Sequence, residues 1–314
     1  MGLWRFVTSQ EIRVVEHCQA EIETFLRRLL PDDLFKPETW KQLTGFVKVL
    51  PDGDILPTRG RYSAQTNDWQ VAVNYVHAES SDSSKALWYS LPDIVASVLL
   101  SGRVPTIIDA FRIEPHGILP GLTTTKLRGR IQVDPASQDF FTVVVEERKR
   151  LPSVTDISEK EKSRLDKALK VLANAASYGI YAQMDRQESD KHVEVRCHGI
   201  DEESFTCKVA HPDVPGEYCF PPLASLITGA ARLMMALLEF KISELGGAYA
   251  MEDTDSMAII AAEQGGILAC PGGPHRTGDG REAVRALSWE QVRQVSDDFA
   301  ALNNFFKYSN VRRY

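Results

Sequence analysis

Two carboxylates lie two residues apart in the run Asp253-Thr254-Asp255. Strand-like runs flank them within Gly247–Ile260, and the turn chemistry between these runs predicts a tight β-hairpin. Side chains two apart in an extended chain point to the same side, about 6–7 Å apart. Because clustered carboxylates repel unless a cation lies between them, the spacing predicts a Mg²⁺ site suited to phosphate chemistry. The alternative is an acidic hairpin tip that faces solvent.

A second set of polar side chains shares one face of a predicted helix. Lys170, Asn174 and Tyr178 follow one another at four-residue spacing, so they project from one side. Lys167 joins that face one turn earlier. The largely opposite face is apolar and carries Leu165, Leu169, Leu172 and Ala176. The alternative for the lysines is a solvated helix face.

Both sets resemble motifs of family B DNA polymerases. The tetrad Asp253 to Ser256 matches Asp-Thr-Asp-Ser in the third polymerase motif of that family, with Met251 and Glu252 where tyrosine and glycine are usual. The stretch 170–179 resembles the second motif, with one residue more between the asparagine and the tyrosine, and with alanine where serine is usual.

A third segment, Leu223–Arg232, resembles the palm helix that precedes the third motif in this family, including Thr228 and Arg232 four residues apart. The resemblance implies nucleotidyl transfer by two metal ions, with Asp253 and Asp255 as catalytic metal ligands. It also implies that Lys170 contacts the phosphates of the incoming nucleotide.

The resemblance assigns the remaining nucleotide-binding residues by position. Tyr178 packs beside the nascent base pair, and Asn174 and Lys167 lie on the same face. Arg148, with Arg150 as a second candidate, grips the triphosphate from the preceding helix. Arginine suits this role because its planar fork pairs bidentately with phosphate oxygens. The alternative for Arg148 is a solvent-facing basic helix end, favoured by the helix dipole.

The first polymerase motif departs from the family pattern. Alignment on Pro92 puts Ala86 where the family has its metal-bridging aspartate, and Asp82 and Asp93 are the nearest carboxylates. We expect the carboxylate hairpin to lie next to the strand through 86–89, and the basic helix faces to lie across a cleft from it. We also expect weak Mg²⁺ binding, poor primer extension by this chain alone, and a gain in Mg²⁺ affinity from Ala86→Asp. Asp93 is either a substitute ligand or an acid at a helix start.

Periodicity and turn signals predict an α/β (α+β) fold, with a polymerase palm-like antiparallel sheet, helices and an inserted two-helix fingers hairpin. The expected division begins with a helical lead-in (1–44), a first palm part with the degenerate first motif (45–139) and a fingers hairpin (140–182). A second palm part with the carboxylate hairpin (183–302) and a tail without a thumb (303–314) follow.

Local signals predict the individual elements. A capping box of Thr8 and Glu11 opens a predicted helix over 9–30, and a box of Ser288 and Gln291 opens the last helix. Glycines predict a surface loop over 265–280. Other helices are expected at 91–100, 140–151, 159–178 and 223–244, and strands within 45–76, 106–131, 192–197 and 204–209.

Composition limits the function classes. The 314 residues carry a formal net charge of −7, which excludes a uniformly basic nucleic-acid binder but leaves room for a local basic groove. Five scattered cysteines favour reduced thiols in a cytoplasm, and a zinc site at Cys197, Cys207, His211 and Cys219 fits no paired spacing.

Arg232 in the most apolar stretch argues against a membrane span. The expected partners are a DNA primer-template and dNTPs, with exonuclease and thumb regions supplied by a longer native chain. The rival classes are a non-catalytic module derived from a polymerase that binds nucleic acid or nucleotide, and an unrelated metal-dependent phosphotransferase.

Overall fold

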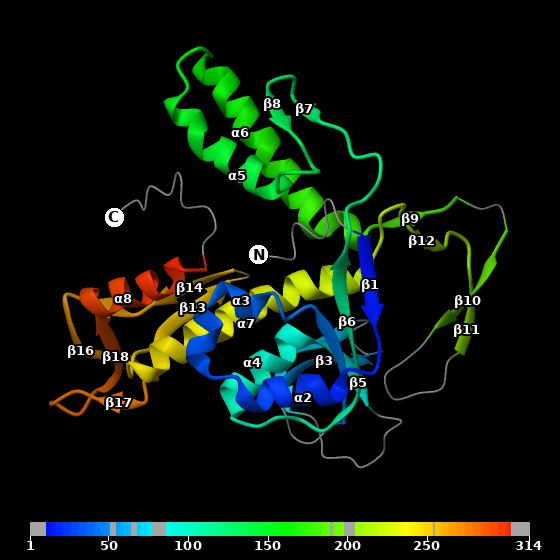
Figure 1. Cartoon of the computed structure of the whole chain (residues 1–314). Coiled ribbons are helices and arrows are strands. Elements are labelled where there is room, and N and C mark those ends of the chain that lie inside the picture. The colour runs from blue at the N-terminus through cyan, green and yellow to red at the C-terminus, as the bar shows by residue number, and fades with distance from the viewer. Residues whose placement is uncertain are drawn as a thin grey trace.

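The computed structural model describes residues 11–50, 55–63, 68–76, 86–188, 191–197, 205–253 and 255–302. Within this part of the chain, α-helices combine with sheets whose strand pairs are antiparallel, apart from the parallel pair β15 (Ala261–Ala262) and β18 (Glu282–Ser288). Figure 1 shows a body that contains most elements and a helical part that projects from it. The predicted α+β class is confirmed.

A four-stranded antiparallel sheet forms the centre of the body. Its order is β1 (Glu11–Val15), β6 (Ile107–His116), β2 (Gly45–Val49), β5 (Leu87–Ser90). The main core brings buried side chains of β2 together with those of α2 (Gln19–Arg28), α4 (Leu91–Ser101) and α7 (Pro221–Glu244); among them are Ile22, Leu26, Val47, Ile94, Leu233 and Leu237. The N-terminal part of the body also contains two short helices, η1 (Pro31–Phe35) and α3 (Pro37–Trp40). A hairpin of β3 (Ile55–Ser63) and β4 (Asp68–Val76) follows them in the chain.

The helix predicted over 9–30 is wrong in its first half. Residues 11–15 form β1, which pairs with β6 from Glu11↔His116 to Val15↔Arg112, and α2 begins only at Gln19. His17 has a φ of 57°, which a right-handed helix cannot contain. The apolar spacing of this segment is compatible with a helix and with a strand, and its β-branched residues favour the strand. Thr8 lies outside the described residues.

Helices α4 and α7 pack closely at Gly229. A Cβ built on this glycine would lie 2.2 Å from Ser90 Oγ and 3.2 Å from Asp93 Oδ2, so any side chain here would displace the Ser90 hydroxyl from its position. Among the described helices, α7 is long and apolar enough to cross a membrane by length and composition. In this fold it buries Leu223, Leu226, Leu233 and Leu237 against the body.

The projecting part, here called the helical unit, comprises residues 125–174. It contains β7 (Thr125–Leu127), β8 (Ile131–Val133), α5 (Phe140–Arg150) and α6 (Glu159–Asn174). Asp139 Oδ1 accepts a hydrogen bond from the Thr142 amide at 2.7 Å and caps α5, and Ser158 caps α6 in the same way. The helix predicted to reach 178 stops as an α-helix at Asn174 and continues as a π-helical turn, Ala175–Gly179, and a 3₁₀ turn, Ile180–Ala182.

Two further hairpins follow, formed by β9 (Met184–Arg186) with β12 (Asp213–Pro215) and by β10 (Val193–Cys197) with β11 (Phe205–Val209). The last part of the chain contains β13 (Tyr249–Asp253), β14 (Ser256–Ile259), β16 (Gln264–Ala269), β17 (His275–Arg276) and α8 (Trp289–Ala300). Ser288 and Gln291 make the predicted capping box.

The loop predicted over 265–280 is wrong at two places, because β16 and β17 pair with β18. A Cβ on Gly265, which has a φ of 68°, would lie 2.9 Å from the Ser288 amide nitrogen. This glycine therefore allows close backbone pairing rather than a loop.

Candidate functional site

The carboxylate hairpin is present. Strands β13 and β14 pair with Asp253 opposite Ser256, and Thr254 lies outside the described residues. The Asp255 amide donates to the Asp253 carbonyl at 2.6 Å, and Ser256 Oγ donates to the same oxygen at 3.0 Å. Asp253 and Asp255 are both exposed, so the turn places their carboxylates at a solvent-facing tip.

The hairpin packs against the last turns of α7. Tyr249 Oη donates to Glu239 Oε1 at 3.2 Å. Burial and the neighbouring Glu239 carboxylate raise the pKa of Glu252, and burial followed by Glu239 also raises the pKa of Tyr249. The carboxylates of Glu239 and Glu252 therefore lie near enough to repel each other where β13 meets α7.

This arrangement predicts that Glu252→Gln stabilises the folded protein by an amount that depends on pH. Since the pKa of Glu252 is raised on folding, the folded state binds more protons, and stability falls as pH rises from the ordinary carboxyl range through the raised pKa. We expect the variant to melt at a higher temperature than the wild type at pH 7. At a pH near 4 the gain should vanish, because the carboxyl is then largely protonated in both states.

The matched control is Glu263→Gln, at an exposed position just beyond the hairpin. Thermal denaturation of both variants at the two pH values checks the prediction. An equal gain at both pH values, or the same pH dependence in the control, would contradict it.

The hairpin does not join the strand that was expected beside it. Within the described residues β13 pairs only with β14, and β5 pairs only with β2, while α7 contacts both β14 and β5. The hairpin and the strand through 86–89, which were expected to be neighbours, therefore belong to different sheets in the described part of the chain. The hairpin contacts α7 through Tyr249 instead.

The described residues supply an incomplete donor set for a metal ion. No group of three or more His, Cys, Asp or Glu side chains suited to a metal occurs among them. The hairpin tip offers the two oxygen-bearing side chains that Mg²⁺ prefers. Ala86 is buried at 8% exposure and has no donor, and Asp82 lies outside the described residues.

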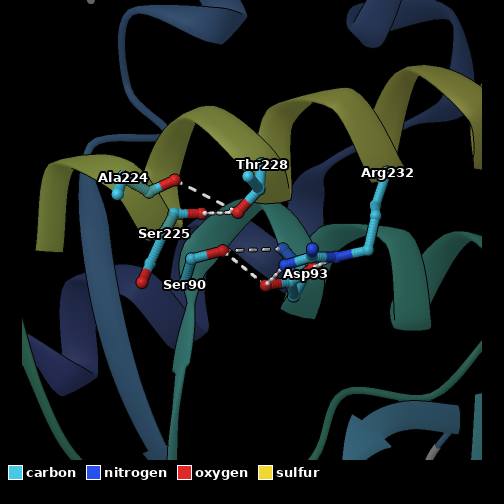
Figure 2. A network of polar contacts seen from close by, with 6 residues as sticks. All are labelled: Ser90, Asp93, Ala224, Ser225, Thr228 and Arg232. Atoms are coloured by element: carbon cyan, nitrogen blue, oxygen red, sulfur yellow. Dashed lines mark hydrogen bonds and ion pairs between the residues drawn. The ribbon is translucent and has the colours of Figure 1, made fainter. Parts of the chain in front are cut away.

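Asp93 accepts hydrogen bonds from the side chains of Arg232 and Ser90 (Figure 2). Arg232 Nε donates to its Oδ1 at 2.7 Å, an Arg232 terminal nitrogen donates to its Oδ2 at 2.9 Å, and Ser90 Oγ donates to Oδ2 at 2.6 Å. The hydrogen bond to Asp93 raises the pKa of the Arg232 guanidinium. Thr228 Oγ1 donates to the carbonyls of Ala224 and Ser225 within α7.

These bonds make Asp93 an anchor between α4 and α7. Both of its oxygens accept hydrogen bonds from Arg232, and only 6% of the residue is exposed. Sequence reasoning placed Asp93 at the helix start, where Ser90 indeed caps α4, but missed the partner. The available signal was Arg232 itself, because a charge in an apolar helix requires a counter-charge.

Arg148, in the last turn of α5, reaches across to the face of α6 that carries Lys170. Arg148 Nε donates to Asp166 Oδ1 at 3.0 Å, and Asp166 precedes Lys170 by four residues on that face. Lys167 and Lys170 are exposed, and neither forms an ion pair within the part of the chain that the structure describes. Several other basic side chains of the unit form ion pairs, among them Arg150–Glu147, Lys162–Glu159 and Arg164–Glu161.

The remaining predicted residues lie at the end of this helix. Asn174 is the last residue of α6 and is exposed, and Tyr178 lies in the π turn. No cleft between this face and the carboxylate hairpin emerges from the described residues. An apolar groove of about 460 Å³ lies elsewhere, between α2 and α4, and is lined by Leu26, Leu34, Val95 and Val98 among others.

Comparison with known proteins found no matching family model, no significant match among curated proteins and none among solved structures. The resemblance to family B polymerases therefore depends on the motifs at 170–179, 223–232 and 253–256 alone.

Proposed function

We propose that this chain is the palm-and-fingers core of a template-directed DNA polymerase similar to family B, which binds primer-template DNA and dNTPs. The observation that carries the proposal is the order of three elements along the chain. A helical hairpin bearing Lys170 comes first, then the long helix α7 with Thr228 and Arg232, and then a β-hairpin with two carboxylates at its turn. The palm-like sheet and the fingers assignment belong to the same proposal.

In this function the basic face of the helical unit holds the triphosphate. Lys170 and Lys167 are solvent-exposed and outside the unit's ion pairs, and Asp166 orients Arg148 through its Nε. The two terminal nitrogens of a guanidinium held in this way still form a fork for phosphate oxygens. Asn174 and Tyr178 would contact the nucleotide further along the helix.

The carboxylate tip holds Mg²⁺ in this proposal, through Asp253 and Asp255. When bound, the ion polarises the phosphoryl group and activates the attacking hydroxyl. Since no group of three or more metal-ligating side chains occurs among the described residues, we expect these two aspartates to bind the ion weakly. The protein's own contribution is to present them at an exposed turn.

A second candidate is a catalytically impaired module that binds nucleotide or nucleic acid. Two observations favour it. Ala86 supplies no ligand, and Asp93, which could have replaced the missing aspartate, is engaged with Arg232 and Ser90. The basic face of the helical unit serves this candidate equally well.

Primer extension with Mg²⁺, together with DNA and dNTP binding by fluorescence titration, tests both candidates. We expect the chain to bind both ligands and to extend a primer slowly, with Asp255→Asn abolishing the extension. Ala86→Asp separates the candidates, because it restores Mg²⁺ affinity and extension only if the hairpin reaches β5. If the wild type and Ala86→Asp both bind DNA and dNTP but neither extends the primer, the result supports the binding module. Rapid extension that survives Asp255→Asn contradicts the assignment of the carboxylates.

A further inference from the structure

The hairpin of β7 and β8 has one buried and one exposed face. Ile131 and Val133 are buried in the core of the helical unit, and Leu127, which pairs with Ile131, packs against that core. Because successive side chains of a strand point to opposite faces, the residues between them face outward. Lys126 and Gln132 are opposite each other on this outer face, and both are exposed. The hairpin is therefore anchored by its inner face and presents its outer face to solvent.

The turn of this hairpin carries two arginines. The Arg130 amide donates to the Leu127 carbonyl at 3.1 Å and closes the turn around Arg128 and Gly129. Both of these central residues have positive φ, 49° and 70°. Asparagine and glycine adopt such a backbone with less strain than arginine does. The fold alone therefore gives no reason for an arginine at 128, and its exposed side chain adds a cation to the turn.

The segment around this turn is basic. Between Glu114 and Asp134 the sequence contains no aspartate or glutamate, although the whole chain has a formal net charge of −7. Lys126 and Arg128 form no ion pair within the part of the chain that the structure describes. Their charges are therefore not neutralised by a neighbouring carboxylate of the described residues, so the outer face and the turn attract anions.

The turn and the nucleotide-binding residues proposed above lie near opposite ends of α6. Arg130 pairs with Asp156 in the loop before α6 at 2.6 Å and is still 45% exposed, so the turn lies beside the start of this helix at Glu159. Figure 1 shows β7 and β8 beside α6 in the projecting part. Lys170 follows Glu159 by eleven residues, which is about 16 Å along the axis. The cations at the turn thus form a group separate from Lys167 and Lys170.

We propose that the basic hairpin, residues 123–132, binds the phosphate backbone of a nucleic acid strand. Its exposed side chains are those of arginine, lysine, threonine and glutamine, all donors of the kinds that contact phosphate oxygens in nucleic-acid complexes. A membrane surface fits less well, because the exposed side chains of this segment include no aromatic or large apolar group to enter the lipid. The site goes beyond the proposed polymerase function and does not depend on it.

The salt dependence of oligonucleotide binding tests this site. The probe is a fluorescent oligo-dT of about 12 nucleotides, within the length that single-strand sites cover, titrated into the full chain without Mg²⁺ or dNTP. Each phosphate contact to a single strand contributes about 0.7 to the slope of log K against log salt. We expect Lys126→Gln/Arg128→Asn to flatten this slope by about 1.4 and to weaken binding at least about tenfold at about 50 mM salt.

Two single substitutions and a control separate charge from structure. Arg128→Asn should weaken binding without lowering the melting temperature, because asparagine tolerates the positive φ of this turn. Arg128→Lys, which keeps the charge, should keep the slope of the wild type. The matched control Arg28→Gln removes an exposed arginine from α2, which lies in the body away from the helical unit, and should leave the slope unchanged (Figure 1).

Three results overturn the site: an unchanged slope in the double variant, an equal flattening in Arg28→Gln, or no binding of the oligonucleotide by the wild type. Hairpin-dependent binding of phosphatidylserine vesicles in place of the oligonucleotide also overturns it. If the double variant does not fold, Lys126→Gln, at an exposed strand position, decides by its own slope.

Primer extension distinguishes this site from the polymerase proposal. If the wild type extends a primer while the hairpin variants bind the oligonucleotide as tightly as the wild type, the hairpin site is wrong and the polymerase proposal stands. If oligonucleotide binding depends on the hairpin but no primer is extended, the result supports the hairpin site and not the polymerase function.

Discussion

Replacing Arg232 with methionine is expected to lower the free energy of unfolding by about 3 kcal/mol. The substitution leaves Asp93, which is only 6% exposed, without its cation between α4 and α7. We take the lower end of the range for broken buried pairs because the Arg232 side chain is itself 49% exposed, so water reaches the site from one side. Urea denaturation of the variant and the wild type measures the difference.

The matched control is Arg276→Met, which removes an arginine from an exposed pair with Glu282 at 3.4 Å. Exposed ion pairs contribute at most about 1 kcal/mol, so this variant should unfold close to the wild type. The double variant Arg232→Met/Asp93→Asn should be less unstable than the sum of the two single variants, because it leaves no unpaired charge. Equal losses for Arg232→Met and Arg276→Met would contradict the anchor role of Asp93.

Replacing Lys170 with alanine is expected to weaken dNTP binding about ten- to a hundredfold. This range corresponds to one lost hydrogen bond to a charged group. It depends on the proposed function, in which Lys170 contacts the triphosphate from the exposed face of α6. Titration of a fluorescent dNTP in the presence of Mg²⁺ measures the affinity. Repeating the titration at several salt concentrations should show a flatter salt dependence for the variant, because one phosphate contact is gone.

Lys160→Ala is the matched control, since Lys160 has the same charge and exposure on the same helix. It lies ten residues before Lys170, which is about 15 Å along the axis and on another face. Its loss should leave the affinity within about twofold of the wild type, as expected for a distant surface charge. Equal affinities for Lys170→Ala and the wild type would remove this face as the nucleotide site.

Elements whose signals are local were predictable from the sequence. The carboxylate hairpin follows from turn residues between two strand-like runs, and the capping box of Ser288 and Gln291 marks the start of α8. The buried face of α6 follows from the helical spacing of Leu165 and Leu169. Each of these features depends on residues within a few positions of one another, so the chain encodes them directly.

Tertiary structure alone decided which of these elements meet. Asp93 and Arg232 are 139 positions apart, and neither residue's local pattern names its partner. The segment 11–15 became a strand because the open edge of β6 offered it hydrogen bonds, although its apolar spacing also suited a helix. Within the described residues the carboxylate hairpin packs on α7 and pairs with no strand of the sheet that contains β5, which no local pattern indicates. Periodicity records which face of an element is apolar, whereas its partner depends on which surfaces fit once the whole chain has folded.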